Sequence, residues 1–270
     1  MSSCENQGKG KGTKMNYSNL CSFNNRVALV TGAAGNIGFA VCRRLAAHGV
    51  KVAAADLSAD RVQARMAELV AGGADIRAYA MDVTSRESVF AAVGDAVRDF
   101  GKLDIVVNNA GVWEHRDVVG RQRFEEMDPK EWKRLMDIDV DGVFHVTQAV
   151  LPHLLRAGYG RIVNLTSIAG EAGLPGYADY ATAKAGMIML TKTLAMENAK
   201  KGITVNCVSP GMVAAGEVGP TPGTWIGRQG SADEMARAIV FLAADESGFI
   251  TGVDIPVEGG RILGPHNCDM

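Results

Sequence analysis

The sequence predicts an α/β fold in which a doubly wound parallel sheet is covered by helices on both faces. Short apolar runs alternate with longer helical patterns along most of the 270 residues. Most of these runs are continuously apolar, as expected of strands that are buried on both faces. Repeated strand–helix–strand units imply right-handed crossovers, and such crossovers produce a parallel sheet.

Seven segments are predicted as strands. In chain order they are residues 26–31, 50–56, 76–82, 103–109, 160–167, 203–209 and 252–260. No internal repeat and no linker divides them, so we predict a single domain over residues 23–270. Residues 1–22 lack the apolar core of a signal peptide and are predicted to form a flexible N-terminal extension.

Three helices carry recognisable start signals. Capping-box spacing occurs at Thr84–Glu87 and again at Ser231–Glu234. Asp128 precedes Pro129, which suits an N-cap followed by a proline at the first helical position. These signals predict helices that begin near residues 85, 129 and 232.

The composition is that of an ordinary soluble globular protein, with 47% hydrophobic and 21% charged residues. A formal net charge of −2 gives no reason to expect nucleic acid or an anionic membrane as partner, and no apolar run is long enough to span a bilayer. The five cysteines fit neither a disulfide framework nor a zinc site, and the five histidines form no ligand cluster. We therefore predict no metal and a cytoplasmic location.

The stretch "TGAAGNIG", residues 31–38, follows the first predicted strand and precedes a helix. A dinucleotide's phosphates bind at such a turn, against the helix N-terminus. Gly32 permits the tight turn, and Gly38 lets the helix approach the strand. Asn36 stands where the commonest version of the motif has glycine, and we expect it to occupy a position with positive φ, which Asn tolerates, with Gly35 adding latitude.

Asp56 ends the second predicted strand, 24 residues after Gly32. A carboxylate at this place can accept hydrogen bonds from the adenosine ribose hydroxyls and would repel a 2′-phosphate. No Arg or Lys stands in the glycine-rich turn or at position 57, so the sequence predicts NAD rather than NADP. The alternative is that Asp56 is the N-cap of the next helix, a role for which Ser58 competes.

"YATAK" places Tyr180 and Lys184 four residues apart on a predicted helix, and therefore on one face. An ammonium beside a phenol favours the phenolate, which gives tyrosine a route to general acid/base catalysis. Ser167 stands 13 residues earlier, at the end of the fifth predicted strand, where it could hold a substrate oxygen. A Tyr-x-x-x-Lys pattern alone is often only a surface pair.

The chain resembles the short-chain dehydrogenase/reductase family over residues 23–263, through "TGAAGNIG", "MDV", "NNAG", Ser167 before "YATAK", "SPGMV" and "ITG…EGG". The resemblance implies a seven-stranded Rossmann sheet, with Tyr180 as catalytic acid/base, Ser167 as substrate-oxygen ligand and Lys184 as ribose contact and Tyr180 activator. The cofactor contacts that it implies, together with those argued above, are Gly32, Gly35, Asn36, Ile37, Gly38, Asp56, Leu57, Asp82, Val83, Asn109, Ala110, Gly111, Tyr180, Lys184, Pro210, Gly211 and Val213.

Three features depart from the family pattern. Ala215 stands where a threonine often contacts the cofactor, and only 16 residues separate Gly211 from Arg228, which suggests a short lid and an open pocket. Asp139 stands where the family has an active-site asparagine. If its carboxylate faces Lys184, it should disfavour the Tyr180 phenolate and shift oxidation toward alkaline pH. The alternative is that Asp139 points away from the site.

The predicted substrate is a secondary alcohol or its ketone. Trp113, His115, Tyr177 and Trp225 either shape an apolar pocket or only pack in the ordinary way. These four residues include no cluster of Lys or Arg, so a strongly anionic substrate is disfavoured. These features favour a hydrophobic cyclic, hydroxysteroid-like alcohol. The alternatives are a 3-oxoacyl thioester (acyl carrier protein) reductase and a nucleotide-sensing protein without turnover.

The predicted helix over residues 180–199 has apolar side chains on more than one face. A helix that packs only on its sheet needs a single apolar stripe. We therefore expect a homotetramer or homodimer, unless the N-terminal extension covers the second face. The apolar residues are Met187, Ile188, Met189, Leu190, Leu194 and Met196.

Overall fold

The computed structural model describes residues 21–113 and 122–264, so most of the predicted N-terminal extension lies outside the described residues. Within them all seven predicted strands form one parallel sheet in the order β3-β2-β1-β4-β5-β6-β7. Their bounds are β1 Val27–Thr31, β2 Lys51–Asp56, β3 Ile76–Ala80, β4 Ile105–Asn108, β5 Gly160–Leu165, β6 Ile203–Pro210 and β7 Asp254–Val257.

The apolar pattern of each strand follows its place in the sheet. Every residue of β1, β4 and β6 is buried, as the continuous apolar runs predict. The two edge strands, β3 and β7, alternate or stay partly exposed. The sequence pattern therefore describes the centre of the sheet better than its edges.

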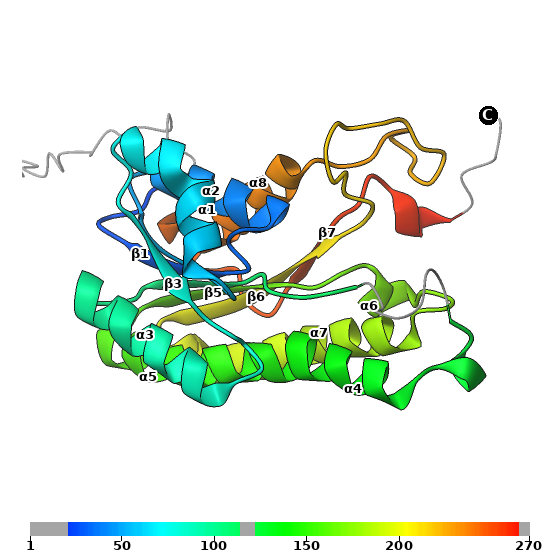
Figure 1. Ribbon diagram of the computed structural model, residues 1–270, viewed down its shortest axis with the longest axis horizontal. Helices are drawn as coiled ribbons and strands as arrows, with labels where there is room; N and C mark the ends of the chain where they lie inside the picture. The colour runs from blue at the N-terminus through cyan, green and yellow to red at the C-terminus, as the bar shows by residue number, and fades with distance from the viewer. Residues whose placement is uncertain (1–20, 114–121, 265–270) are drawn as a thin grey trace, which may run out of the picture.

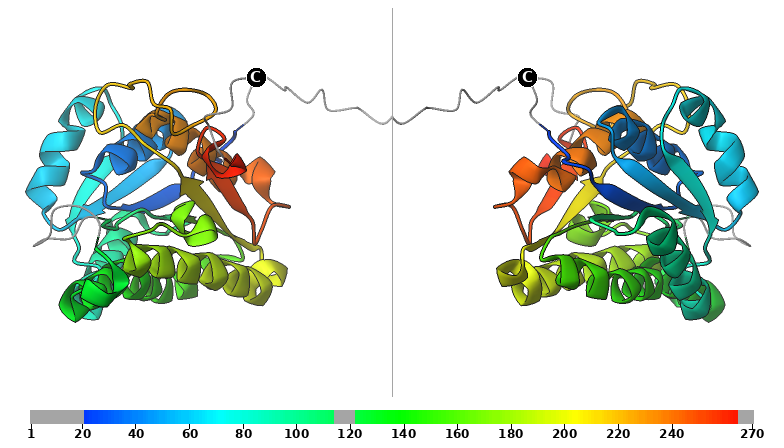
Figure 2. Two further views of the ribbon diagram at one scale, coloured as in Figure 1. Left: turned by 90° about the vertical axis from the view of Figure 1, so that its right-hand side faces the viewer. Right: turned by 90° about the vertical axis from the view of Figure 1, so that its left-hand side faces the viewer.

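Helices cover both faces of the sheet, as predicted (Figures 1 and 2). α1, α2 and α8 pack on one face, while α3, α4, α5 and α7 lie on the other, and each layer encloses its own buried apolar cluster. The bounds are α1 Asn36–Ala47, α2 Ala59–Ala71, α3 Arg86–Phe100, α4 Pro129–Met136, α5 Gly142–Ala157, α6 Ala169–Ala172, α7 Ala178–Asn198 and α8 Ala232–Ala243.

All three predicted helix starts are confirmed, because α3, α4 and α8 begin at Arg86, Pro129 and Ala232. Ser231 forms a reciprocal capping box with Glu234 at α8, and the Asp128 side chain accepts a hydrogen bond from Lys130 N–H at α4. The capping box at Thr84 is wrong, because Ser85 is the N-cap of α3. The Ser85 hydroxyl accepts from Ser88 N–H at 3.2 Å, while the Thr84 hydroxyl donates to Asp82 Oδ1 at 2.7 Å.

The segment before β1 is tied to the end of α8. Ser22 N–H donates to Glu246 at 2.9 Å, and the Arg26 guanidinium lies 2.9 Å from Asp245, both acids lying just after α8. Arg26 also pairs with the buried Asp104 at the start of β4. The segment that leads into β1 is therefore linked to the turn after α8 by charged hydrogen bonds.

None of the described helices is both long enough and apolar enough to cross a membrane. In the described residues, His, Cys, Asp and Glu side chains form no group that could hold a metal ion. Cys42 and Cys207 are fully buried, and burial raises the pKa of both thiols. The cytoplasmic location stays a prediction.

Candidate active site

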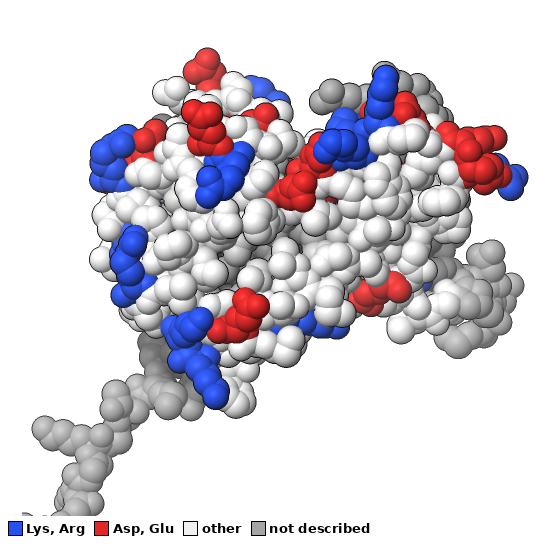
Figure 3. Space-filling model, turned by 90° about the horizontal axis from the view of Figure 1, so that it is seen from below, with Lys and Arg blue, Asp and Glu red and all other residues white. Residues whose placement is uncertain are grey.

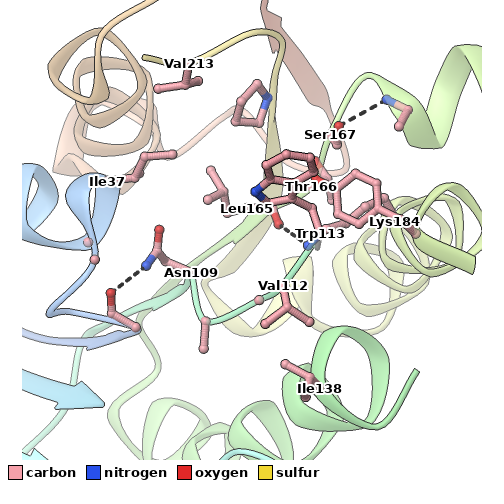
Figure 4. Close-up of a pocket in the computed structure, with 18 of the residues that line it drawn as sticks. Ile37, Asn109, Val112, Trp113, Ile138, Leu165, Thr166, Ser167, Lys184 and Val213 are labelled. Atoms are coloured by element: carbon pink, nitrogen blue, oxygen red, sulfur yellow. Dashed lines mark hydrogen bonds between the residues drawn. The ribbon is translucent and has the colours of Figure 1, made fainter. Parts of the chain in front are cut away.

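A large cleft opens at the carboxyl end of the sheet, where the strand order reverses between β1 and β4. Ligands bind at such switch points in doubly wound sheets. The cleft has a volume of about 2070 Å³, and every residue predicted for catalysis or cofactor binding lines it. Figure 4 shows Ile37 and Asn109 on one side of this pocket and Ser167 and Lys184 on the other. The fold thus brings all the predicted site residues together.

The glycine-rich turn is built for close backbone packing. Gly32 has φ 64°, and a Cβ on Gly38 would lie only 2.2 Å from Gly32 O. The Asn109 side chain, at the end of β4, donates to the Gly32 carbonyl at 3.0 Å. A side chain at position 32 or 38 would collide with the neighbouring backbone and with Asn109, so the tight turn requires glycine at both positions. The turn lines the cleft at a helix N-terminus, where a pyrophosphate can bind.

The expected backbone role of Asn36 is wrong. Asn36 is the first residue of α1, and the positive φ of the turn belongs to Gly32, which directly follows β1. The side chain of Asn36 instead donates through Nδ2 to Ala215 O at 2.8 Å. Asn36 therefore links the glycine-rich turn to the segment after β6. Ala215 takes part in this link through its backbone carbonyl, although its side chain lacks the hydroxyl of the family's threonine.

Asp56 lies at the rim of the same turn. Its Oδ2 accepts from Ala34 N–H at 3.1 Å, and its Oδ1 accepts from Leu57 N–H at 2.9 Å. Ser58, not Asp56, is the N-cap of α2, because its hydroxyl accepts from Arg61 N–H. The N-cap alternative is thus excluded, and the Asp56 carboxylate faces the cleft.

The pocket candidates taken from the sequence include no clustered basic residues, but the cleft as a whole does, so the prediction against an anionic substrate does not hold. Arg61 of α2 lines the cleft beyond Leu57, and three basic residues of α4 and Arg261 line it as well. Local sequence patterns indicate only the glycine-rich turn, position 57 and the aromatic candidates as parts of the cleft. α4 and the C-terminal turn reach the cleft through the tertiary fold. The α4 residues are Lys130, Lys133 and Arg134.

Ser167 follows β5 and is nearly buried. Its hydroxyl oxygen accepts from Ala169 N–H at 3.1 Å, which fixes the side chain at the start of α6 (Figure 4). A Cβ on Gly170 would lie 2.7 Å from the backbone of Lys184 and of Ala185. The absence of a side chain at Gly170 therefore lets the Ser167 segment pack directly on α7.

Tyr180 and Lys184 lie on one face of the first turns of α7, as predicted. The Lys184 ammonium is 5.5 Å from the Tyr180 ring centroid and donates to Leu165 O at 3.2 Å. Lys184 is 4% exposed. A buried, fixed cation next to a phenol at a cleft is an arrangement suited to acid/base catalysis, so the pair is not a surface contact.

The alternative that Asp139 points away from the site is also wrong. Asp139 is fully buried in a π-helical turn, Asp137–Asp141, and its Oδ1 lies 3.7 Å from Lys184 Nζ. The same oxygen accepts from Val112 N–H at 3.0 Å. Burial raises the pKa of the Asp139 carboxyl, and the Lys184 charge opposes that rise.

Of the four aromatic side chains proposed from the sequence to shape the substrate pocket, only one is found in the wall of the cleft within the described residues. Trp113 lines the cleft, and its ring lies 6.2 Å from that of Tyr177, which packs behind it. Trp225 lies against Gly260 and, like Tyr177, is not part of the cleft wall. His115 lies outside the described residues.

Sequence reasoning missed several wall residues near the lid. Met212 follows Gly211, and its sulfur lies 3.0 Å from Arg261, whose guanidinium also donates to Gly223 O at 2.9 Å. These contacts join the segment after β6 to the turn after β7. No spacing rule links residues so far apart in sequence, so no local signal could have found them.

The fold and the cleft together define a Rossmann-type protein with room for a dinucleotide and a second ligand. Residues 26–221 match the family model described as short chain dehydrogenase. The chain is 40% identical over 246 residues to an acetoacetyl-CoA reductase of Rhizobium meliloti, covering 87% of this chain and 98% of the relative. It is 41% identical over 252 residues to a trans-4-hydroxycyclohexanecarboxylate dehydrogenase of Sinomonas cyclohexanicum, covering 88% and 93%.

A solved xylitol dehydrogenase with bound NAD⁺ has the same fold, with a TM-score of 0.81, 35% identity and coverage of 88% of this chain and 99% of that one. The chain belongs to the short-chain dehydrogenase family and is an oxidoreductase. Members of this family use a nicotinamide cofactor.

Proposed function

We propose that this protein interconverts a secondary alcohol and a ketone, with Tyr180 as acid/base. The observation that carries the proposal is the buried Lys184 ammonium, held 5.5 Å from the Tyr180 ring in the same cleft as the glycine-rich turn. In oxidation the Tyr180 phenolate takes the proton of the alcohol, and in reduction the phenol returns it. Ser167 holds the substrate oxygen during both steps.

The cofactor in this proposal is NAD, which would supply the hydride acceptor when bound. The cradle between Gly32 and Gly38 fits a pyrophosphate, and the Asp56 carboxylate faces the place that a ribose would occupy. The solved relative with bound NAD⁺ supports the same choice. Arg61 is the opposing feature, because it could attract a 2′-phosphate at this end of the cleft.

For the substrate we propose a 3-oxoacyl thioester and its 3-hydroxyacyl product. The similarity to an acetoacetyl-CoA reductase supports this class over the hydroxysteroid-like alcohols that the sequence favours. The basic residues of α4 at the cleft also suit a substrate whose carrier group is anionic. This reverses the order of preference predicted from the sequence.

A cyclic secondary alcohol is the second candidate. Trp113, Leu174, Pro175 and Met212 give part of the cleft an apolar wall, on which an alicyclic ring could pack. The relative that acts on a hydroxycyclohexanecarboxylate supports this class. A nucleotide sensor without turnover has less support, since it would need no buried lysine beside Tyr180.

The test measures NADH and NADPH oxidation with acetoacetyl-CoA, cyclohexanone and a 3-ketosteroid, and the reverse reactions with the matching alcohols. The proposal predicts the highest kcat/KM with NADH and acetoacetyl-CoA. A preference for cyclohexanone would select the second candidate. No turnover with any pair, by protein that binds NADH, would contradict the enzymatic proposal and favour the sensor.

We further propose that the chain forms a homotetramer or homodimer through α5 and α7. Met189 and Met196 are 60% and 77% exposed on α7, and Phe144 is 48% exposed on α5. Figure 3 shows that the centre of this face is mostly uncharged, with Lys, Arg, Asp and Glu mainly around its rim. Met189→Lys with Met196→Lys should lower the mass in solution, while Val70→Lys on α2 should not. An unchanged mass in the double variant would contradict this interface.

A further inference from the structure

Asp139 is a buried carboxyl group whose place in the fold is defined by three elements. The π-helical turn between α4 and α5 carries it, and its side chain is 0% exposed. Its Oδ1 accepts from Val112 N–H after β4 and lies 3.7 Å from Lys184 Nζ on α7. A buried charge in this position interacts with its neighbours more strongly than it would in water.

Gly111 makes this approach possible. A Cβ at position 111 would lie 2.6 Å from Asp139 Oδ1 and 3.3 Å from Lys184 Nζ. Gly111 itself lines the cleft. The carboxyl and ammonium groups therefore meet directly behind the wall along which the cofactor is proposed to lie.

The charges that face Asp139 come from two helices. Lys184 lies on α7, and Arg134 on α4 adds a second favourable charge, itself paired with Glu131 at 2.8 Å. On the π-helical turn, Asp137 pairs with Lys133 and Asp141 is exposed to solvent. Burial raises the pKa of the Asp139 carboxyl, while Lys184, Val112 N–H and Arg134 favour its charged form.

The second carboxyl oxygen, Oδ2, is buried and has no hydrogen-bond partner among the residues that the structure describes. An unsatisfied buried oxygen is costly, so Oδ2 has the capacity to bind a polar group from outside the described residues. Compared with an apolar side chain of similar size, this carboxyl group adds a negative charge 3.7 Å from Lys184 Nζ.

We propose, on the basis of the function proposed above, that Asp139 is a positioning residue that holds the Lys184 ammonium behind Gly111 and sets the pH range of the reaction. Its negative charge partly cancels the effect of Lys184 on Tyr180. Alcohol oxidation starts at higher pH, and ketone reduction, which needs the phenol, persists to higher pH.

The separations of 3.7 Å and 5.5 Å place the carboxylate within about 9 Å of the Tyr180 ring centre. A unit charge at that distance, with an effective dielectric constant of about 20, shifts a titration by roughly one pH unit. Asp139→Asn removes the charge and keeps an oxygen that can accept from Val112 N–H. Both the acidic limb of oxidation and the alkaline limb of reduction should then move to lower pH by roughly one unit.

The experiment records kcat/KM against pH in both directions for the wild-type protein, Asp139→Asn and Asp141→Asn. Asp141→Asn removes an acid of the same turn from the surface and should leave both limbs unchanged. The phenolate absorbance of Tyr180, taken as the difference between each protein and its Tyr180→Phe version, follows the same ionisation without turnover. If Asp139→Asn does not fold, Asp139→Ser provides the same neutral site.

Matching shifts of both limbs and of the absorbance titration in the Asp139 variant alone would support the proposal. Unchanged limbs, or equal shifts in Asp141→Asn, would overturn it. A folded Asp139→Asn protein that binds NADH but is inactive at every pH would also overturn it, because the carboxyl would then take part in the chemistry. Absence of wild-type turnover would count against the proposed function, and the absorbance titration would still decide the role of Asp139.

Discussion

The two ends of the cleft are built in different ways. The nucleotide end consists of backbone turns in close contact, such as Gly38 against Gly32 O. The opposite end consists of side chains from α4, α6, α7 and the segments after β6 and β7. A backbone cradle serves any member of a family that binds the same cofactor, whereas a wall of side chains can change with the substrate. The nucleotide end of the cleft therefore indicates its ligand more directly than the opposite end indicates the substrate.

The largest effect is expected at the chemical end of the cleft. Tyr180→Phe keeps the ring and removes the transferable proton, so kcat should fall by roughly 10²–10⁴-fold. NADH binding, measured by fluorescence titration, should be unchanged because the nucleotide end is untouched. Near wild-type turnover would place the acid/base on another residue.

The next effect concerns the nucleotide end. Gly38→Ala adds a Cβ 2.2 Å from a backbone oxygen that cannot move aside, and should lower the free energy of unfolding by about 3 kcal/mol and weaken NADH binding. Gly94→Ala is the control, because Gly94 lies in the interior of α3 with nothing within 4 Å of an added Cβ. It should stabilise by up to about 1 kcal/mol. Urea unfolding of both variants measures the difference, and equal stability would show that the turn is not tightly packed.

Features that depend on short spacings could be predicted from the sequence. The seven strands, the turn at residues 31–38 and the Tyr180–Lys184 pair are each encoded within a few residues, and the fold then carries them to one cleft. Features that depend on distant parts of the chain could not be predicted. Asn36 contacts Ala215, and Asp139 approaches Lys184, only because parallel strands align their carboxyl ends.

The basic residues of the cleft show the same limit. Lys130 and Lys133 belong to a short helix whose sequence reads as an ordinary polar surface, and only the packing of α4 beside α7 directs them to the cleft. The wrong N-cap at Thr84 has a different origin. Two adjacent residues, Thr84 and Ser85, could each cap α3 from the sequence alone, and in the structure Ser85 does so while Thr84 bonds to Asp82.

A third prediction tests the discrimination between cofactors at the nucleotide end. Asp56→Ala should reduce the proposed preference for NADH over NADPH by on the order of 1–3 kcal/mol, because it removes the carboxylate proposed to bond the ribose and to repel a 2′-phosphate. Arg61→Ala is the matched variant and should weaken NADPH more than NADH, since it removes a cation of the same cleft end. The ratios of kcat/KM measure both. A wild-type preference for NADPH would contradict the role given to Asp56.

The smallest effect is expected from an ion pair between α1 and α8, the helices that pack on the same face of the sheet. Hydrogen bonds from Arg44 and Arg43 of α1 lower the pKa of Asp233 on α8 to about 2. The folded pKa is below the unfolded value, so the stabilisation is present above about pH 4 and disappears as pH falls through about 2. Because the pair is partly exposed, Asp233→Asn should cost at most about 1 kcal/mol at pH 7 and almost nothing at pH 2. A loss that did not depend on pH would assign the effect to packing.

The link between residues 22–26 and the turn after α8 can form only late in synthesis, when the residues just after α8 have been made. Every neighbouring strand pair in the sheet is parallel, so no hairpin can form early. The central strand β1 waits for β4, and the segment before β1 waits for Asp245. Until Asp245 and then β7 leave the ribosome, the nascent protein carries an incomplete sheet with open edges, which exposes it to aggregation.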